Sequence, residues 1–140
     1  MNKLQPNNQH HRELLQSIAR RAMLERDLLP DLSVAALAEL DKIHSLAGMD
    51  NGLIRDQRDL IWASIDNDDS LDLDQLTVAE AMPGGKVKVM VAIADVDSLV
   101  KKGSAIDDHA RKNTTSVYTA AEMFPMLPEK LSTGLTSLNL

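Results

Sequence analysis

The chain has 140 residues and a hydrophobic content of 44%, which is enough apolar material to bury the core of one domain of ordinary size. Its formal net charge of -6 argues against a free-standing protein that holds nucleic acid through a broad basic surface, because phosphate binding depends on Lys and Arg. The chain contains no cysteine, which excludes a disulfide-linked partner, a thiolate zinc site and a cysteine nucleophile.

The first stretch of the chain, residues 1–11, is polar and lacks the apolar centre of a signal peptide. No uninterrupted apolar run in the sequence approaches the roughly 20 residues that a membrane-spanning helix needs. We therefore expect a cytoplasmic protein with no membrane partner.

Two helices are predicted in the first third of the chain. Apolar residues recur near helical spacing from Arg12 to Asp27, with charges between them, and indicate an amphipathic helix. Its arginines could touch RNA, although a solvated helix face is the commoner role of so short a basic patch. After Pro30, Ser33 can cap a second helix that runs through Leu46, with Gly48 just beyond its last turn.

Strands are predicted in the middle of the chain. The mostly apolar run Leu60–Ile65 ends abruptly in aspartates and is typical of a buried strand that leads into a polar loop. The sequence KVKVMVAIA, Lys86–Ala94, follows the turn signal Pro83-Gly84-Gly85 and predicts a second strand, with Leu76–Ala81 as its antiparallel partner in a hairpin. We expect the apolar residues of Lys86–Ala94 to stay exposed if the chain is only part of a larger domain.

The last part of the chain is predicted to hold a helix over Ala105–Lys112, an extended piece over Thr115–Tyr118 and a proline-rich connection. The Asn51-Gly52 turn signal divides the chain into an N-terminal helical region with a flexible start, residues 1–55, and a second domain, residues 56–140. The sequence stops without a terminating signal, so we expect the second domain to be truncated at its C-terminus. The predicted fold class is α+β.

The segment SIDNDDSLDLDQL, residues 64–76, carries the most chemical information. Its five acidic residues are Asp66, Asp68, Asp69, Asp72 and Asp74. Carboxylates at this density repel one another unless positive charge neutralises them, and Mg²⁺ favours a few carboxylates completed by water and phosphate.

Three interpretations of this acidic segment compete. One is an exposed acidic turn with no further role. A calcium loop of the EF-hand kind needs Gly at position six and Glu at position twelve, but counting from Asp66 gives Leu71 and Thr77. A site for phosphoryl-transfer chemistry is the third, and the strand predicted just before the segment favours it.

The spacing of Asp66, five residues, then Asp72-Leu73-Asp74 resembles the aspartate signature of the RNB catalytic domain of ribonuclease II-type exoribonucleases. Later stretches resemble that family in the same order: VAIADVDSLVKKGSAID (residues 91–107), SVY (116–118) and FPMLPEKLSTGLTSLN (124–139). The sequence departs from the family pattern at Gln75, where many members carry a further Asp, and at Leu71, where a polar residue is expected.

The resemblance implies a magnesium-dependent 3′-to-5′ exoribonuclease that hydrolyses RNA to nucleoside 5′-monophosphates. It assigns Asp66, Asp72 and Asp74 as Mg²⁺ ligands, with Asp74 the most critical for catalysis, and it places Tyr118 against the terminal nucleotide of a single-stranded RNA 3′ end. Without the resemblance, Tyr118 would be interpreted as a core residue, while Asp95 is expected to cap the turn that follows the second strand.

The fold implied by the resemblance is the incomplete mixed α/β sheet of an RNB-type catalytic domain, preceded by the two N-terminal helices. Because the remaining site residues of that domain lie outside this sequence, we expect the 140-residue chain to have little activity alone. The alternative is a truncated, non-catalytic domain that binds RNA or a divalent metal.

Overall fold

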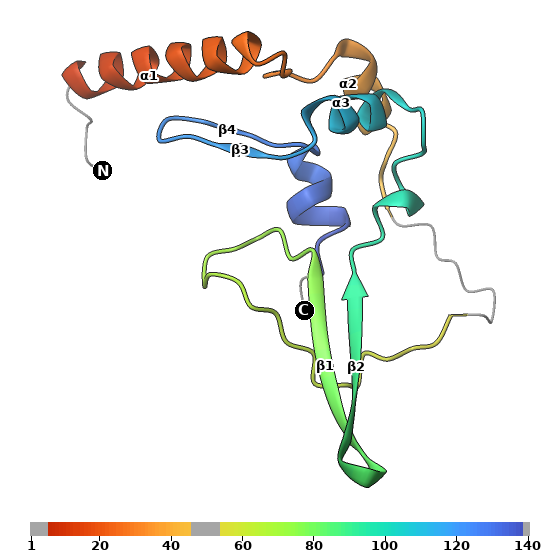
Figure 1. Ribbon diagram of the computed structural model, residues 1–140. Coiled ribbons are helices and arrows are strands. Elements are labelled where there is room, and N and C mark those ends of the chain that lie inside the picture. The colour runs from red at the N-terminus through yellow and green to blue at the C-terminus, as the bar shows by residue number, and fades with distance from the viewer. Residues whose placement is uncertain (1–5, 46–53, 139–140) are drawn as a thin grey trace. The chain divides into compact units, whose positions relative to one another are not determined.

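The computed structural model of the chain describes residues 6–45 and 54–138 (Figure 1). Its main elements in chain order are α1 (Pro6–Glu25), α2 (Val34–Leu40), β1 (Gln75–Met82), β2 (Lys86–Ile93), α3 (Ala105–Asn113), β3 (Val117–Tyr118) and β4 (Met123–Phe124). Within the described residues β1 pairs with β2 and β3 with β4, both antiparallel. This combination of helices with small antiparallel sheets confirms the α+β class.

The chain forms two compact units, and each is built from two separate stretches of sequence. The first unit contains Met1–Lys42 and Lys102–Pro128, and the second contains Ile43–Lys101 and Glu129–Leu140. The predicted division of the chain at residue 55 stays a prediction. Among the described residues, no helix combines the length and the apolar character that crossing a membrane demands.

Both N-terminal helices are confirmed, with different bounds. Helix α1 begins at Pro6, earlier than the predicted Arg12, because the apolar pattern marks only the amphipathic part and a formed helix extends into polar residues at little cost. Proline suits this first position, where no backbone N–H is needed. In α2 the Ser33 hydroxyl accepts a hydrogen bond of 3.1 Å from the amide of Ala36, which confirms the predicted cap.

Helix α2 is shorter than predicted, because it ends at Leu40 and does not run to Leu46. The last turn tightens: the amide of Lys42 bonds to the carbonyl of Glu39, which is the closer spacing that often closes a helix. The apolar spacing in the sequence therefore continues beyond the last hydrogen bond of the helix. Leu46, Gly48 and the Asn51-Gly52 turn lie outside the described residues.

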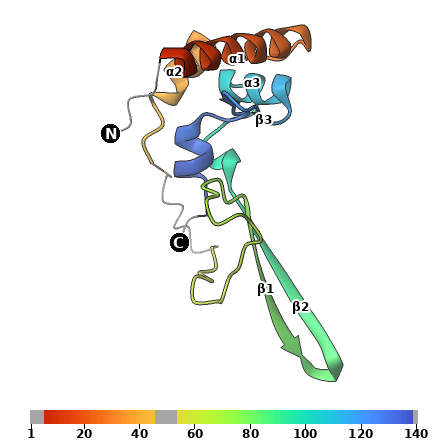
Figure 2. The same ribbon diagram turned by 90° about the vertical axis from the view of Figure 1, so that its left-hand side faces the viewer.

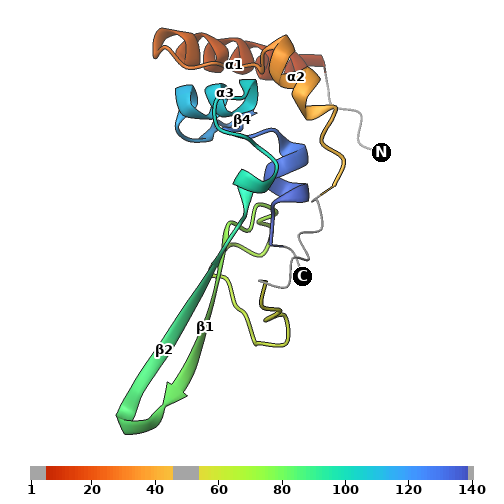
Figure 3. The same cartoon turned by 90° about the vertical axis from the view of Figure 1, so that its right-hand side faces the viewer.

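Helix α3 is docked onto α2 at its first turn (Figure 3). It spans the predicted region, and the Ser104 hydroxyl caps it by accepting a hydrogen bond of 3.2 Å from the amide of Asp107. The carboxylate of Glu39, from α2, accepts hydrogen bonds from the amides of Ala105 at 2.9 Å and Ile106 at 3.1 Å. These bonds to backbone N–H groups lower the pKa of Glu39, and negative charge is favourable at a helix N-terminus.

The C-terminal end of α3 carries two buried polar residues, Asn113 and His109. The Asn113 side chain accepts a hydrogen bond of 2.8 Å from the Leu29 amide and donates one of 2.9 Å to the Leu29 carbonyl. The Asn113 amide nitrogen also lies 3.2 Å from Nε2 of His109, which is buried one turn earlier. With Ile106 and Phe124, these groups belong to the core of the first unit.

The second unit is dominated by the predicted hairpin, in which β1 and β2 run side by side as a twisted ribbon (Figure 2). Its register pairs Gln75 with Ile93 and Met82 with Lys86. The turn between the strands needs glycine, because Gly84 and Gly85 have φ values of 75° and 73°. After the hairpin, the carboxylate of Asp95 accepts a hydrogen bond of 3.2 Å from the Ser98 amide and so caps the next turn as predicted.

The predicted buried strand Leu60–Ile65 is wrong. Only Ala63 forms a bridge, to Thr77 of β1, and the side chains of Ile61 and Ile65 are 89% and 99% exposed. An apolar run becomes a buried strand only where other elements cover it, and the described residues supply no such cover.

One face of β2 is apolar and open to solvent. Because side chains alternate along a strand, four residues share this face, and each is more than half exposed: Val87, Val89, Val91 and Ile93. The expected exposure of apolar residues in Lys86–Ala94 is therefore observed.

Candidate metal and nucleic-acid site

The three predicted metal ligands lie in the irregular segment that leads into β1, within the second unit. Asp74 directly precedes β1, and its carbonyl accepts a hydrogen bond of 2.9 Å from the Ala94 amide, which extends the β1–β2 ladder by one step. Asp72 is half-buried, while Asp66 is exposed and stands just before a turn. The backbone position of Asp74 is therefore set by the hairpin.

A second contact holds the backbone between the aspartates. The amide of Leu73 donates a hydrogen bond of 3.0 Å to the Ser137 hydroxyl, which in turn donates one of 2.8 Å to the carbonyl of Leu71. The amide of Leu138 donates a hydrogen bond of 2.9 Å to the carbonyl of Leu73. Residues 71–73 are thereby clamped to residues 137–138, and the clamp includes Asp72.

The charges of Asp72 and Asp66 act on Asp74, which is exposed at its side chain. Desolvation by the surrounding chain raises the pKa of the Asp74 carboxyl, and the two negative charges raise it further. Like charges that destabilise each other in this way are relieved by a bound cation. Carboxylate oxygens are also the donors that a hard cation such as Mg²⁺ prefers, so the donor chemistry fits the predicted metal.

The three carboxylates do not form a finished metal cage. In the described part of the chain, no group of three or more His, Asp or Glu side chains is arranged so that it could hold a metal ion. The structure therefore brings Asp66, Asp72 and Asp74 within electrostatic reach of one another without converging their oxygens.

Tyr118, the predicted nucleotide-binding residue, lies in the first unit on the small β3–β4 hairpin. It pairs with Met123 across the two strands, and its side chain is 68% exposed. An aromatic ring this exposed does not fill a core, so the core interpretation is not supported. The neighbouring Phe124, by contrast, is 1% exposed and anchors the hairpin.

Two residues that support these groups have no signal in the sequence. Ser137 is 64 positions from Leu73, and nothing near it in the chain predicts that its hydroxyl binds the acidic loop. Arg20 lies on the helix face that the sequence predicts to be solvated, but its guanidinium binds Asp31 and Glu122. Contacts of this kind join residues far apart in the chain and leave no local pattern.

Comparison with known proteins places residues 54–140 in the RNB domain family. Ribonuclease R of Escherichia coli (strain K12) is 45% identical over 84 residues, which is 60% of this chain and 10% of that protein. Ribonuclease R of Thermotoga maritima is 44% identical over 84 residues, which is 60% of this chain and 12% of that protein. The chain thus spans about a tenth of the length of these curated relatives.

Solved structures of Mycoplasma genitalium RNase R resemble this fold. The complex with double-stranded RNA superposes with a TM-score of 0.72 at 32% identity, covering 84% of this chain and 21% of that one. The complex with ribose methylated single-stranded RNA gives a TM-score of 0.70 at 31% identity, covering 84% and 18%. These matches include residues that precede the segment matched by the family model.

Proposed function

We propose that this chain, which belongs to the RNB domain family, supplies the metal-binding aspartates and a nucleotide-binding tyrosine of a cytoplasmic exoribonuclease. The proposed reaction is magnesium-dependent hydrolysis of single-stranded RNA from its 3′ end, with release of nucleoside 5′-monophosphates. The proposed partner is therefore RNA, and the proposed cofactor is Mg²⁺.

The observation that carries the proposal is the closeness of Asp72 and Asp66 to Asp74, in the spacing that resembles the family signature. Desolvation and then the negative charges of those two neighbours raise the pKa of Asp74. These three residues would hold Mg²⁺. When bound there, the cation would neutralise charge on the scissile phosphate and lower the pKa of a coordinated water.

The chain's own contribution is to fix where those carboxylates stand. The hydrogen bond from Ala94 holds the Asp74 backbone at the start of the hairpin, and the clamp from Ser137 holds the backbone next to Asp72. Fixed ligands reduce the reorganisation needed when phosphate arrives, which is a main source of rate in phosphoryl transfer.

Tyr118 is proposed to pack against the terminal base of the RNA. Its exposed ring supports this role, because stacking needs an accessible aromatic face. Stacking is also tolerant of base identity, as an enzyme that degrades any sequence requires. Two of the solved structures of Mycoplasma genitalium RNase R contain bound RNA, which supports RNA as the partner proposed for this chain.

Product analysis tests the proposal. The longest native polypeptide that contains these residues should release nucleoside 5′-monophosphates one at a time from an oligoribonucleotide, and a chelator should stop the reaction. A substrate whose 3′ end is chemically blocked should resist degradation, whereas an identical substrate blocked at the 5′ end should not. Internal cleavage, products that carry a 3′-phosphate, or unchanged activity in chelator would each contradict the proposal.

A second candidate is a non-catalytic domain that binds RNA or a divalent cation. Gln75 favours it, because this residue stands where many family members carry a further carboxylate and so reduces the charge available to a metal. Tight binding of oligoribonucleotide by the native polypeptide, with no hydrolysis under any divalent metal, would favour this second function.

A further inference from the structure

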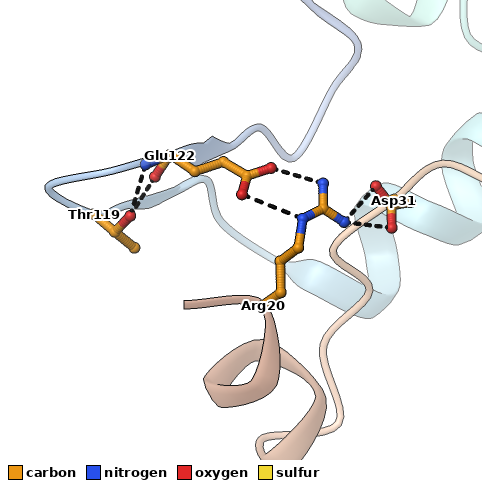
Figure 4. A network of polar contacts seen from close by, with 4 residues as sticks. All are labelled: Arg20, Asp31, Thr119 and Glu122. Atoms are coloured by element: carbon orange, nitrogen blue, oxygen red, sulfur yellow. Dashed lines mark hydrogen bonds and ion pairs between the residues drawn. The ribbon is translucent and has the colours of Figure 1, made fainter. Parts of the chain in front are cut away.

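A network of ion pairs joins helix α1 to the β3–β4 hairpin (Figure 4). The guanidinium of Arg20 donates to both carboxylate oxygens of Glu122, from Nε at 3.2 Å and from Nη2 at 2.7 Å. Its Nη1 donates to both oxygens of Asp31, at 2.9 and 2.7 Å. All three nitrogens of the guanidinium are thus engaged, in the forked geometry that only arginine provides.

The contact between Arg20 and Glu122 is better shielded than an ordinary surface pair. The Glu122 side chain is 20% exposed and that of Arg20 is 40% exposed, whereas the neighbouring pair Arg21–Glu25 on the same helix is 71% and 65% exposed. The Arg20 guanidinium carbon also lies 5.8 Å from the centre of the buried Phe124 ring. Partial shielding strengthens both the ion pair and the contact with the ring.

Glu122 is a rigid part of the turn that follows Tyr118. The Thr119 hydroxyl accepts a hydrogen bond of 3.0 Å from the Glu122 amide and donates one of 2.5 Å to the Glu122 carbonyl. The Thr119 amide donates a further bond of 3.1 Å to the same carbonyl. A displacement of Glu122 would therefore be transmitted to Thr119 and to the adjacent Tyr118.

The hairpin needs an external anchor, because its strands are only two residues each and a pair this short is not stable alone. Phe124 anchors the base of β4 in the core, and Arg20 anchors the turn. Tyr118 is itself part of β3, so the backbone of this hairpin sets the direction in which its exposed ring leaves the strand.

We propose that Arg20 is a positioning residue for Tyr118: through Glu122 it holds the β3–β4 hairpin so that the exposed ring is ready to receive a nucleotide base. The inference rests on the proposed function, since the base is the ligand assigned to Tyr118. Arg20 lies outside residues 54–140, so the helix that precedes the RNB match would take part in nucleotide binding.

The first arm of the test needs no RNA. Tyr118 is the one tyrosine of the chain, so labelling with 3-fluorotyrosine gives a ¹⁹F resonance that reports this ring alone. Arg20→Ala and the milder Glu122→Gln should shift or broaden that resonance in the folded protein. Arg21→Ala removes the same charge from the same helix and should leave the resonance in place.

A purely stabilising role would behave differently in this arm. It would lower the unfolding temperature of Arg20→Ala and Glu122→Gln but leave the native ¹⁹F resonance unchanged, with the helical circular dichroism of the native state intact. That result would overturn the inference. The triple change Arg20→Glu, Glu122→Arg and Asp31→Asn should bring the resonance back toward its original position, because it restores an ion pair at the same place without setting two carboxylates against each other.

The second arm adds a short oligoadenylate and measures its Kd for the full chain. Tyr118→Ala should weaken binding by about fivefold or more, the lower end of what stacking on an aromatic ring contributes. Glu122→Gln should also weaken it, by a smaller factor. Weaker binding by Glu122→Gln would be diagnostic, because removing a negative charge would by itself strengthen the attraction to phosphate.

The two arms separate the inference from the proposed function. If Tyr118→Ala binds oligoadenylate like the original chain while the ¹⁹F resonance moves in Arg20→Ala, the role of Tyr118 fails and its positioning by Arg20 stands. If Tyr118→Ala weakens binding but Glu122→Gln tightens it and leaves the ¹⁹F resonance unchanged, the positioning role of Arg20 is overturned and the proposed function stands.

Discussion

The hydroxyl of Ser137 accepts a hydrogen bond of 3.0 Å from the amide of Leu73, the residue that separates two of the candidate metal ligands. The same hydroxyl donates to the carbonyl of Leu71, so one side chain satisfies a donor and an acceptor of the acidic loop. The acidic loop is thereby held through its main chain at Leu71 and Leu73, on either side of Asp72.

Replacement of Ser137 by Ala should loosen this loop. A hydrogen bond contributes about 1 kcal/mol net, so the loss of the bond from the Leu73 amide should speed its hydrogen exchange by roughly fivefold, and by more if the bond to Leu71 adds to it. Exchange measured by NMR checks this directly. Ser132→Ala, in the helical turn Lys130–Leu135, is the control and should leave that amide unaffected. Equal exchange rates in both variants would mean that Ser137 does not hold the loop.

Asp74→Asn separates metal chemistry from acidity. The change keeps the size of the side chain but removes the charge that a hard cation requires, so turnover by the longest native polypeptide should fall by at least on the order of 100-fold. RNA binding should survive, because loss of a carboxylate does not weaken attraction to phosphate.

The matched control is Asp68→Asn, in the same acidic segment but outside the signature. It should reduce turnover far less than Asp74→Asn. If both variants showed the same modest loss, the aspartates would be only an acidic turn and the assignment of Asp66, Asp72 and Asp74 as ligands would fail.

The parts of the fold that were correctly predicted are those set by neighbouring residues. Ser33 lies next to the helix that it caps, and Pro83-Gly84-Gly85 supplies the backbone conformations that the hairpin turn needs. Asp95 caps a turn three residues long for the same reason. Such features depend on local chemistry, which a single sequence contains.

The parts that were missed or wrong depend on residues far away in the chain. Leu60–Ile65 has the composition of a buried strand, but burial is decided by what covers it. Arg20 and Glu122 are separated by 102 positions, so no spacing rule connects them. The aspartate spacing is local and identifies the candidate ligands, whereas the clamp from Ser137 joins residues 64 positions apart.

The exposed face of β2 should make the chain self-associate. Val89→Lys places a charge among the apolar side chains of that face and should raise the highest concentration at which the chain is still monomeric. Its stability should not fall, because the Val89 side chain is already exposed. Light scattering against concentration measures the effect. The control is Glu80→Gln, which makes the same change in net charge on the opposite face of the hairpin. An equal rise in the monomeric concentration range from this variant would show that charge alone, and not the apolar face, governs association.

His109 should make the stability of the chain depend on pH. Burial lowers the pKa of this side chain, and the nearby backbone carbonyl of Pro125 offsets part of that effect. The Nδ1 atom itself is buried and forms no hydrogen bond of normal geometry. Above the ordinary pKa of about 6.5 both the folded and unfolded states hold it neutral. As the pH falls below that value the unfolded state takes up a proton first, so the free energy of unfolding decreases.

Urea unfolding at about pH 7.5 and about pH 5.5, on either side of that ordinary pKa, tests this. His109→Gln should lose less stability between the two values than the original chain, even if it is less stable at both. His11→Gln, at an exposed position of α1, should keep the original pH dependence. The same slope in all three proteins would rule out His109 as the source.

In the proposed exoribonuclease, Tyr118 should determine how far the RNA is degraded. In the longest native polypeptide, Tyr118→Ala should change the length of the final undegraded product more than the rate of degradation of long RNA. A long strand is still held by distant contacts, whereas a short one depends on stacking, which is worth roughly 1 to 3 kcal/mol per base. Tyr118→Phe keeps the aromatic face and should leave the product length unchanged. Gel analysis of the end products measures both variants. An unaltered product length in Tyr118→Ala would show that the exposed ring of this hairpin does not hold the terminal nucleotide.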